Sequence, residues 1–165
     1  MHGQDIVVAL KLAFDDEELS DAELGNELGL TASQVQVAMK RATKAAIVAA
    51  GTRDVNRQAL LEFLLHGLKF VFPAKRGPIV RGMPTAHSAP PLNKSIVDGT
   101  PVVWPDPEGT ARGESIEPLH EGVPNASRRD PQLYECLALV DAIRLGREPE
   151  RKLATKRLEE ILVSV

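Results

Sequence analysis

The sequence of 165 residues contains one cysteine, Cys136, so the chain can form no internal disulfide bond. This lack is typical of proteins in a reducing compartment and indicates a cytoplasmic protein. No apolar run approaches the roughly 20 residues that a membrane-spanning helix needs. The N-terminal stretch MHGQDIVVALKLAFDDEE lacks a basic leader and a small-residue cleavage site. We therefore expect it to be a first helix and not a signal peptide, and we expect no membrane partner.

The motifs of common catalytic and metal sites are also missing. The sequence has no CxxC, no HExxH, no Gly-rich phosphate loop and no closely spaced histidine pair. His87 and Ser88 are adjacent, but neighbours in sequence do not generally reach the geometry that a base and its hydroxyl need. We therefore predict that the protein is not an enzyme and that it holds no metal ion and no cofactor.

Proline is absent from residues 1–72, whereas eleven of the twelve prolines lie in residues 73–131. The sequence thus predicts a mainly α fold in three parts: a helical bundle at 1–72, a Pro/Gly-rich segment at 73–131 and a C-terminal helical pair at 132–165. We expect the middle segment to be ordered but irregular, without helices and with short strands at GPIVRG and TPVVWP. Its many large apolar side chains favour order, and a disordered linker is the alternative.

The first and the fourth predicted helices supply much of the apolar surface of residues 1–72. A helix near Gln4–Phe14 is expected to bury Ile6, Val7, Leu10 and Phe14. Another begins after Asn56, a good helix cap, and continues as RQALLEFLLHGLKFVF. This helix is apolar on nearly every side, which predicts a central position or one shared with a partner chain.

Two helices are predicted at the C-terminal end. The first is capped by Asp130, has Pro131 in its first turn and ends at Gly146. Cys136 lies on its apolar side and is expected to be a core residue. The second starts at Pro149, with these residues facing inward: Leu153, Ala154, Leu158, Ile161 and Leu162. We expect these helices to form the dimer contact of a homodimer.

Between these parts lies the stretch AELGNELGLTASQVQVAMKRATKAAIV, residues 22–48, which predicts two short amphipathic helices. The first ends at Gly29, which can adopt the left-handed conformation that terminates a helix. Thr31 opens the second, with Gln34 three residues later as in a capping box. A buried stripe follows the helical spacing: Val35, Ala38, Met39 and Ala42. The opposite face is polar and cationic. A plain helical hairpin that contacts no DNA is the alternative.

The small and apolar residues of this stretch fall at regular intervals: Leu24, Gly25, Leu28, Gly29, Leu30, Val35, Ala38 and Met39. In this pattern residues 5–50 resemble the helix-turn-helix of bacterial transcription regulators, particularly the winged-helix kind similar to MarR. The resemblance implies a DNA-binding regulator such as a repressor, and the chain is also similar to small regulators of toxin–antitoxin or defence loci. Only eight residues, AAGTRDVN, separate the second helix from the next, so we expect any wing to come from residues 73–131.

Charge is unevenly distributed, although the net charge is only −3. Residues 1–30 carry one lysine and eight acids, a net −7, whereas residues 31–81 carry nine cations and two acids, a net +7. Phosphates would attract the second region, and the first would discourage non-specific binding. Two oppositely charged faces that pair within a dimer are the alternative.

These observations predict a homodimeric transcriptional regulator that binds double-stranded DNA in a sequence-specific way. The second helix starts at Thr31. Expected phosphate contacts are Lys40, Arg41, Lys44 and Arg53. Expected base contacts are Ser33, Gln34, Gln36 and Val37, since glutamine can pair with adenine and valine can contact a thymine methyl group.

Three further cations lie in the stretch FPAKRGPIVRGMP: Lys75, Arg76 and Arg81. Arginines among glycines and prolines suit a narrow minor groove, so these residues complete the predicted DNA-binding set. Bonds to carbonyls or carboxylates within the fold are the alternative. A different class of function is also open: an antitoxin-like or adaptor module whose Pro-rich segment wraps a partner enzyme.

Overall fold

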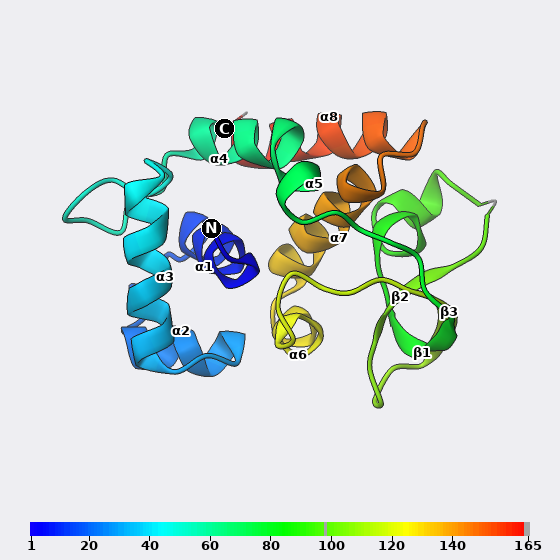
Figure 1. Ribbon diagram of the computed structural model, residues 1–165, viewed down its shortest axis with the longest axis horizontal. Helices are drawn as coiled ribbons and strands as arrows, with labels where there is room; N and C mark the ends of the chain where they lie inside the picture. The colour runs from blue at the N-terminus through cyan, green and yellow to red at the C-terminus, as the bar shows by residue number, and fades with distance from the viewer. Residues whose placement is uncertain (98, 164–165) are drawn as a thin grey trace.

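The computed structural model describes residues 1–97 and 99–163, and over this range the chain is mainly helical with one small sheet (Figure 1). Positions 98, 164 and 165, which fall in the predicted middle and C-terminal segments, lie outside the described residues. A single hydrophobic cluster contains residues of all three predicted segments, among them Leu10, Trp104 and Leu137. None of the described helices is long and apolar enough to cross a membrane.

Helix α1 (Gly3–Ala13) lies between α3 and α7 and is buried on most sides (Figure 1). The predicted core residues Ile6, Val7 and Leu10 are fully buried. Phe14, predicted to be buried with them, follows the end of the helix and is only half-buried. The helix is therefore a central element of the N-terminal part.

Helices α2 (Asp21–Leu28) and α3 (Ala32–Lys44) confirm the prediction of two short helices joined by a tight turn. Gly29 ends α2 with a left-handed φ of 73°, and Thr31 and Gln34 form the predicted capping box of α3. The N–H of Leu30 donates to the carbonyl of Gly25 at 2.8 Å, and a Cβ at Gly25 would collide with the carbonyl oxygen of Leu30. The glycine thus lets the turn lie directly on α2.

A small hairpin, residues 47–56, connects α3 to the next helix. Val48 and Val55 form one antiparallel bridge, flanked by two backbone hydrogen bonds of 2.9 and 2.7 Å. Gly51 has a left-handed φ of 72° in the loop, which lets so short a segment reverse direction. A single bridge is less than two paired strands, so the expectation that this segment is too short for a two-stranded wing is not contradicted.

The long apolar helix predicted after Asn56 is divided into α4 (Arg57–His66) and α5 (Leu68–Val71). Gly67 separates them, because glycine favours a helix less than most residues do. A larger residue does not fit at this position, since its Cβ would collide with the Phe63 ring. Helix α4 packs against α8 within the same chain, which accounts for much of its apolar surface. On α5, Phe70 and Val71 remain 76% and 49% exposed.

The middle segment forms a closed three-stranded sheet of β1 (Ile79–Pro84), β2 (Val102–Pro105) and β3 (Ala111–Ser115). Strand β1 is antiparallel to both others, and β2 and β3 are parallel to each other. The segment is ordered and has strands at both predicted places. Strand β3 was not predicted, because ARGES lacks the apolar alternation of a half-buried strand.

The expectation that the middle segment has no helices is wrong. It contains α6 (Val123–Arg129) and two short 3-10 helices, η1 (Ala86–Ser88) and η2 (Leu92–Lys94). Proline excludes helix only in the interior, and Pro124 lies in the first turn of α6, where the missing N–H is not needed.

The C-terminal helices are α7 (Pro131–Leu145) and α8 (Glu150–Leu162). As predicted, Asp130 caps α7, Gly146 ends it, and Cys136 is fully buried, where burial raises the pKa of its thiol to about 12. In α8, Ala154, Leu158 and Leu162 face inward and Ile161 is half-buried. Leu153 is 37% exposed, so its predicted inward position is wrong.

A buried polar cluster joins the sheet to α7. The carboxylate of Asp141 accepts hydrogen bonds from Thr85 Oγ1 at 2.7 Å, from Trp104 Nε1 at 2.7 Å and from Arg144 at 2.8 Å. Arg144 also donates to the backbone carbonyl of Phe72 at 2.9 Å. Because every buried polar group needs partners, these bonds fix the position of the middle segment on the helical core.

Candidate nucleic-acid interface

The outer face of α3 is exposed along its whole length. Six of the predicted contact residues lie on it: Ser33, Gln34, Gln36, Val37, Lys40 and Lys44. Val37 is 46% exposed, which is unusual for a valine on a face that is otherwise polar. The predicted stripe on the opposite side is buried at Val35, Ala38 and Ala42 and half-buried at Met39, so the helix presents the predicted side outward.

Two polar residues at the start of this face also make bonds within the chain. The side-chain oxygens of Thr31 and Gln34 each accept a hydrogen bond from the other's backbone N–H, at 3.1 and 2.9 Å. Gln36 donates from Nε2 to Asp21 on α2 at 3.1 Å. An acid therefore lies beside one of the predicted base-reading residues. A hollow between α3 and the hairpin, of about 400 Å³, is lined by Asp21, Gln36 and Lys40 among others.

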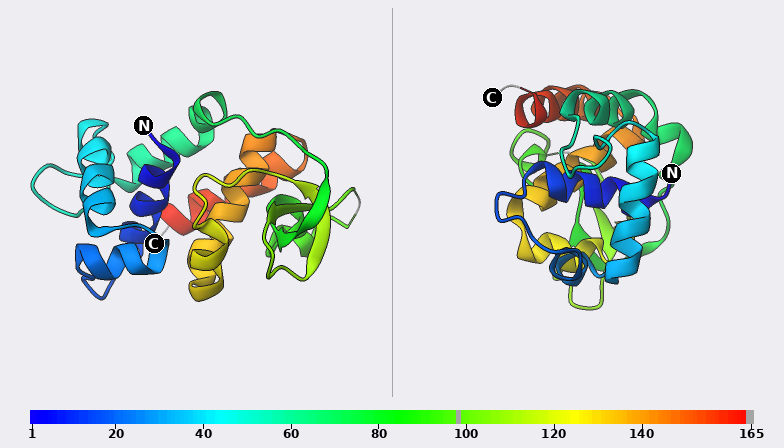
Figure 2. Two further views of the ribbon diagram at one scale, coloured as in Figure 1. Left: turned by 60° about the horizontal axis from the view of Figure 1, so that its bottom comes forward. Right: turned by 90° about the vertical axis from the view of Figure 1, so that its left-hand side faces the viewer.

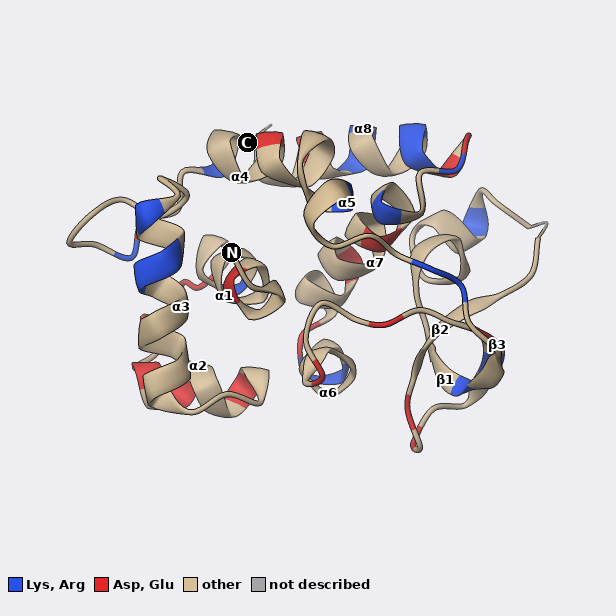
Figure 3. Cartoon of the chain, viewed as in Figure 1, with Lys and Arg blue, Asp and Glu red and all other residues tan. Residues whose placement is uncertain are grey.

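Lys40 and Lys44 supply the cationic character of the face (Figure 3). Over the described residues neither ammonium group has a hydrogen bond or an ion pair. An exposed lysine on a rigid helix is a suitable phosphate contact, because its charge is not neutralised beforehand.

Arg41 differs from the two lysines. Its guanidinium donates to the fully buried Asp5 of α1, from Nε at 2.8 Å and from Nη2 at 2.9 Å. These hydrogen bonds raise the pKa of Arg41. Arg41 therefore forms an ion pair that holds α3 on α1, and its phosphate contact stays a prediction.

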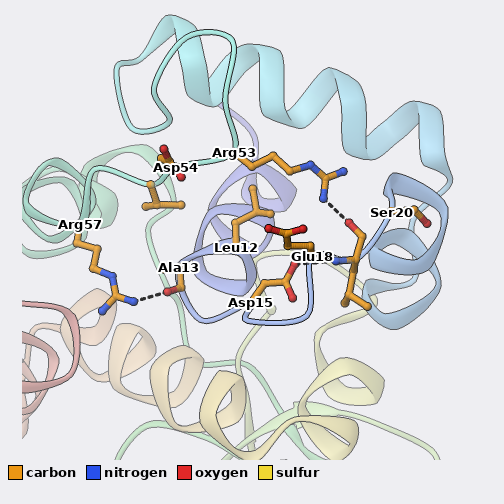
Figure 4. A pocket seen from close by; sticks show the side chains of 10 residues that line it. Leu12, Ala13, Asp15, Glu18, Ser20, Arg53, Asp54 and Arg57 are labelled. Carbon is orange, nitrogen blue, oxygen red and sulfur yellow. Dashed lines mark hydrogen bonds between the residues drawn. The ribbon is translucent and has the colours of Figure 1, made fainter.

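Arg53 lies in the hairpin and is also bonded within the chain. It donates to the backbone carbonyl of Leu19 (Figure 4). It also donates to the carboxylate of Asp21. Arg57 at the start of α4 donates to the carbonyl of Ala13 and lies over the Phe14 ring. Both arginines line a cavity of about 710 Å³ together with the acids Asp15, Glu18 and Asp54. Since these charges largely offset one another, the cavity shows no clear preference for an anion or a cation.

The three predicted cations of the middle segment lie at the other end of the molecule. Lys75 and Arg76 precede β1 and Arg81 lies in it, while α3 and the hairpin form the opposite end in Figure 1 and in the left-hand view of Figure 2. Arg76 pairs with Glu114 at 3.8 Å, and Arg81 is exposed. The structure therefore separates the predicted DNA-binding residues into two distant groups.

Sequence reasoning missed two features of these surfaces. The Val48–Val55 hairpin lies directly beside α3, and Gly51 in a polar stretch between two valines was the signal for it. Arg112 lies opposite Arg81 on β3. The dipeptide Arg-Gly occurs at 76–77, 81–82 and 112–113, so it did not by itself indicate that Arg81 and Arg112 are neighbours.

The other residues considered for chemistry have structural partners. The Nε2 of His87 is 3.1 Å from the carbonyl oxygen of Thr100, and Ser88 Oγ accepts from the N–H of Val102 at 3.0 Å. Over residues 1–97 and 99–163, no three His, Cys, Asp or Glu side chains are grouped as metal ligands would be. The exposed face of α3 is thus the predicted site that retains its residues together.

Comparison with protein-family models, with curated proteins and with solved structures found no match for this chain.

Proposed function

We propose that the protein is a transcriptional regulator that binds duplex DNA with α3 as the recognition helix of a helix-turn-helix. One observation carries this proposal: the outer face of α3 combines two lysines without partners among the described residues, an exposed valine and exposed Ser33 and Gln34. The helix is short, rigidly capped and held on α1 by the Asp5–Arg41 pair. A helix of this kind fits the major groove.

In the proposed complex, Lys40 and Lys44 contact phosphates. Ser33, Val37 and the amide nitrogen of Gln34 lie toward base edges, where Val37 suits a thymine methyl group. Gln36 and Arg53 contribute less to DNA binding in this proposal, because each already donates a hydrogen bond to Asp21. The hairpin at residues 47–56 follows α3 at the place where winged-helix proteins carry their wing, and its exposed loop would lie against the DNA backbone.

We further propose a homodimer, because one short helix specifies too few base pairs for useful selectivity. Phe70 and Val71 on α5 are the candidate contact, since they are 76% and 49% exposed next to the α4–α8 face. Sedimentation at micromolar concentration tests this part separately. A monomer near 17.9 kDa would count against the dimer without affecting the proposal for α3.

The test of DNA binding is the salt dependence of affinity for a labelled duplex. Two phosphate contacts per protomer predict a slope of log K against log salt of about −2 per protomer. Lys40→Ala with Lys44→Ala should remove most of this slope. The matched control is Lys152→Ala with Lys156→Ala on α8, which removes the same charge from exposed positions distant in sequence. Equal loss in both double variants would show that net charge and not α3 governs binding.

A further inference from the structure

Two arginines lie directly opposite each other on the small sheet. Arg81 of β1 and Arg112 of β3 are register partners in an antiparallel pair, and both side chains are exposed. Residues opposite each other in this way have Cβ atoms about 5 Å apart, and like charges at such positions destabilise a sheet. Over the described residues, no hydrogen bond or ion pair involves either guanidinium. The sheet therefore places two guanidinium groups side by side, neither of them in an ion pair among the described residues.

The neighbouring residues on the same face of the sheet add an apolar side chain to the two positive charges. Ile79 is two residues before Arg81 and is 59% exposed. Its cross-strand partner is the acid Glu114, which pairs with Arg76 at 3.8 Å. We name Ile79, Arg81 and Arg112 the arginine face: one large apolar side chain beside two guanidinium groups.

The backbone beneath this face is rigid. Gly82 and Gly113, which follow the two arginines, are buried, and a Cβ at either would collide with the carbonyl oxygen of Trp104 or Pro101. Trp104 in turn is held by Asp141 at 2.7 Å. Each glycine lets another strand approach while the preceding arginine points outward. A site on such a fixed base needs little ordering when a ligand binds.

We infer that the arginine face is the docking site for an acidic segment of a partner protein. Carboxylates would pair with Arg81 and Arg112, and an apolar side chain would cover Ile79. Arginine suits this role because its planar fork binds a carboxylate through two hydrogen bonds, and arginine is enriched in the residues that dominate protein interfaces.

A protein fits the face better than nucleic acid does. A phosphate backbone offers nothing apolar to cover Ile79, which is 59% exposed. The sheet also lies at the opposite end of the molecule from α3, so DNA on α3 leaves this face open (Figure 2). The inference goes beyond the proposed function and does not depend on it.

The binding test uses the full chain and three labelled probes at low salt: a peptide of alternating glutamate and leucine, the same peptide with glutamine for glutamate, and a 20-base-pair duplex. The parent should bind the glutamate peptide and not the glutamine peptide. Arg81→Gln with Arg112→Gln should weaken peptide binding at least about tenfold, because each loses charge-assisted hydrogen bonds. The matched control Lys152→Gln with Lys156→Gln should bind the peptide like the parent.

The melting temperature of the free protein is a second measurement. It distinguishes a binding role of the two arginines from a role in stabilising the fold, because the two roles predict changes of opposite sign. Arg112→Glu replaces a like-charge pair by an ion pair with Arg81, so the free protein should melt about 1–2 °C higher while peptide binding is lost. Melting several degrees lower would show that the arginines stabilise the fold and would overturn the inference.

Each remaining outcome is also decisive. No binding of the glutamate peptide by the parent, or equal binding by both arginine and lysine variants, would overturn the inference. So would a loss confined to the duplex probe, which would make the face a nucleic-acid site. Failure of the α3 lysines to affect duplex binding would contradict the proposed function alone.

Discussion

The buried carboxylate of Asp5 on α1 pairs with the guanidinium of Arg41 on α3, with nitrogen–oxygen distances between 2.8 and 3.1 Å. Asp5 also accepts the backbone N–H of His2 at 2.8 Å, so one side chain caps α1 and holds α3. This pair sets which side of α3 faces solvent. It connects the core of the N-terminal part to the proposed DNA-reading surface.

We expect Arg41→Met to lower the free energy of unfolding by about 3 kcal/mol, because it leaves the Asp5 charge buried without its partner. Urea denaturation measures this loss. Asp5→Asn with Arg41→Met should cost less than the sum of the two single changes. The neighbouring Lys40→Met is the control and should stay within about 0.5 kcal/mol of the parent, since Lys40 is exposed. A small effect of Arg41→Met would show that the pair contributes little.

Gly25→Ala should lower stability by about 1–3 kcal/mol, because the new Cβ would push the Leu30 carbonyl away and open the turn before α3. Asn26→Ala, one residue later and exposed, is the control and should be neutral or slightly stabilising, since alanine favours a helix more than asparagine. Thermal melting of both variants measures the difference. Equal stability of the two would mean that α2 and the turn are not tightly packed.

The helix ends of this fold could be predicted from the sequence, because they depend on residues that are close together in the chain. Ser20, whose side chain caps α2, was missed, whereas Gly29, Thr31 and Asp130 marked their helix ends because capping depends on residues a few positions apart. The role of Arg41 depends on Asp5, 36 residues away, and nothing local distinguishes Arg41 from Lys40. Local pattern therefore predicted which face of α3 is exposed, but not that Arg41 is bonded within the chain while Lys40 has no partner among the described residues.

In residues 73–131, too, the features that depend on residues distant in sequence could not be predicted. The two apolar strands of this segment were predicted from local pattern, whereas β3 is defined by its pairing with both β1 and β2, which are distant in sequence. The buried Asp141 could not be distinguished from a surface acid, since its partners Thr85 and Trp104 lie 56 and 37 residues away. Separation of the cations into two ends likewise follows from tertiary packing alone.

Trp104→Phe should lower stability by about 1–3 kcal/mol, because it removes one of the donors that satisfy the buried Asp141. Thr85→Val removes another and should have a comparable effect. The two changes combined should depart from additivity, since both act on the same carboxylate. Additive effects in denaturant unfolding would mean that Asp141 does not couple them.

Stability should fall in acid partly through Asp130. Burial acts to raise the pKa of this carboxyl, but hydrogen bonds from Lys11 and from the N–H groups of Leu133 and Gln132 outweigh it, so the pKa lies below its usual value. A lowered pKa in the folded state gives stability that is present above the unfolded pKa, near 3.9, and is lost as pH falls through the folded pKa. Asp130→Asn keeps a capping side chain and loses this dependence.

The free energy of unfolding, measured between pH 2 and pH 7, checks the prediction for Asp130, because this interval includes the usual pKa of an aspartate. The stability of the parent should decline more steeply below about pH 4 than that of Asp130→Asn. Parallel curves for the two proteins would show that the bond from Lys11, at 2.7 Å, does not favour the ionised carboxylate.

The most direct test of the proposed recognition helix is a titration of the ¹⁵N-labelled protein with duplex DNA, followed by the shifts of its amide NMR signals. The duplex should carry the binding site found by a DNA-protection assay, or random sequence at low salt. We predict that the shifts concentrate on residues 31–44 and on the hairpin at 47–56, and that signals of β1 and β3 stay in place. Shifts confined to the sheet, or no shifts at all, would contradict the assignment of α3 as the DNA-reading element.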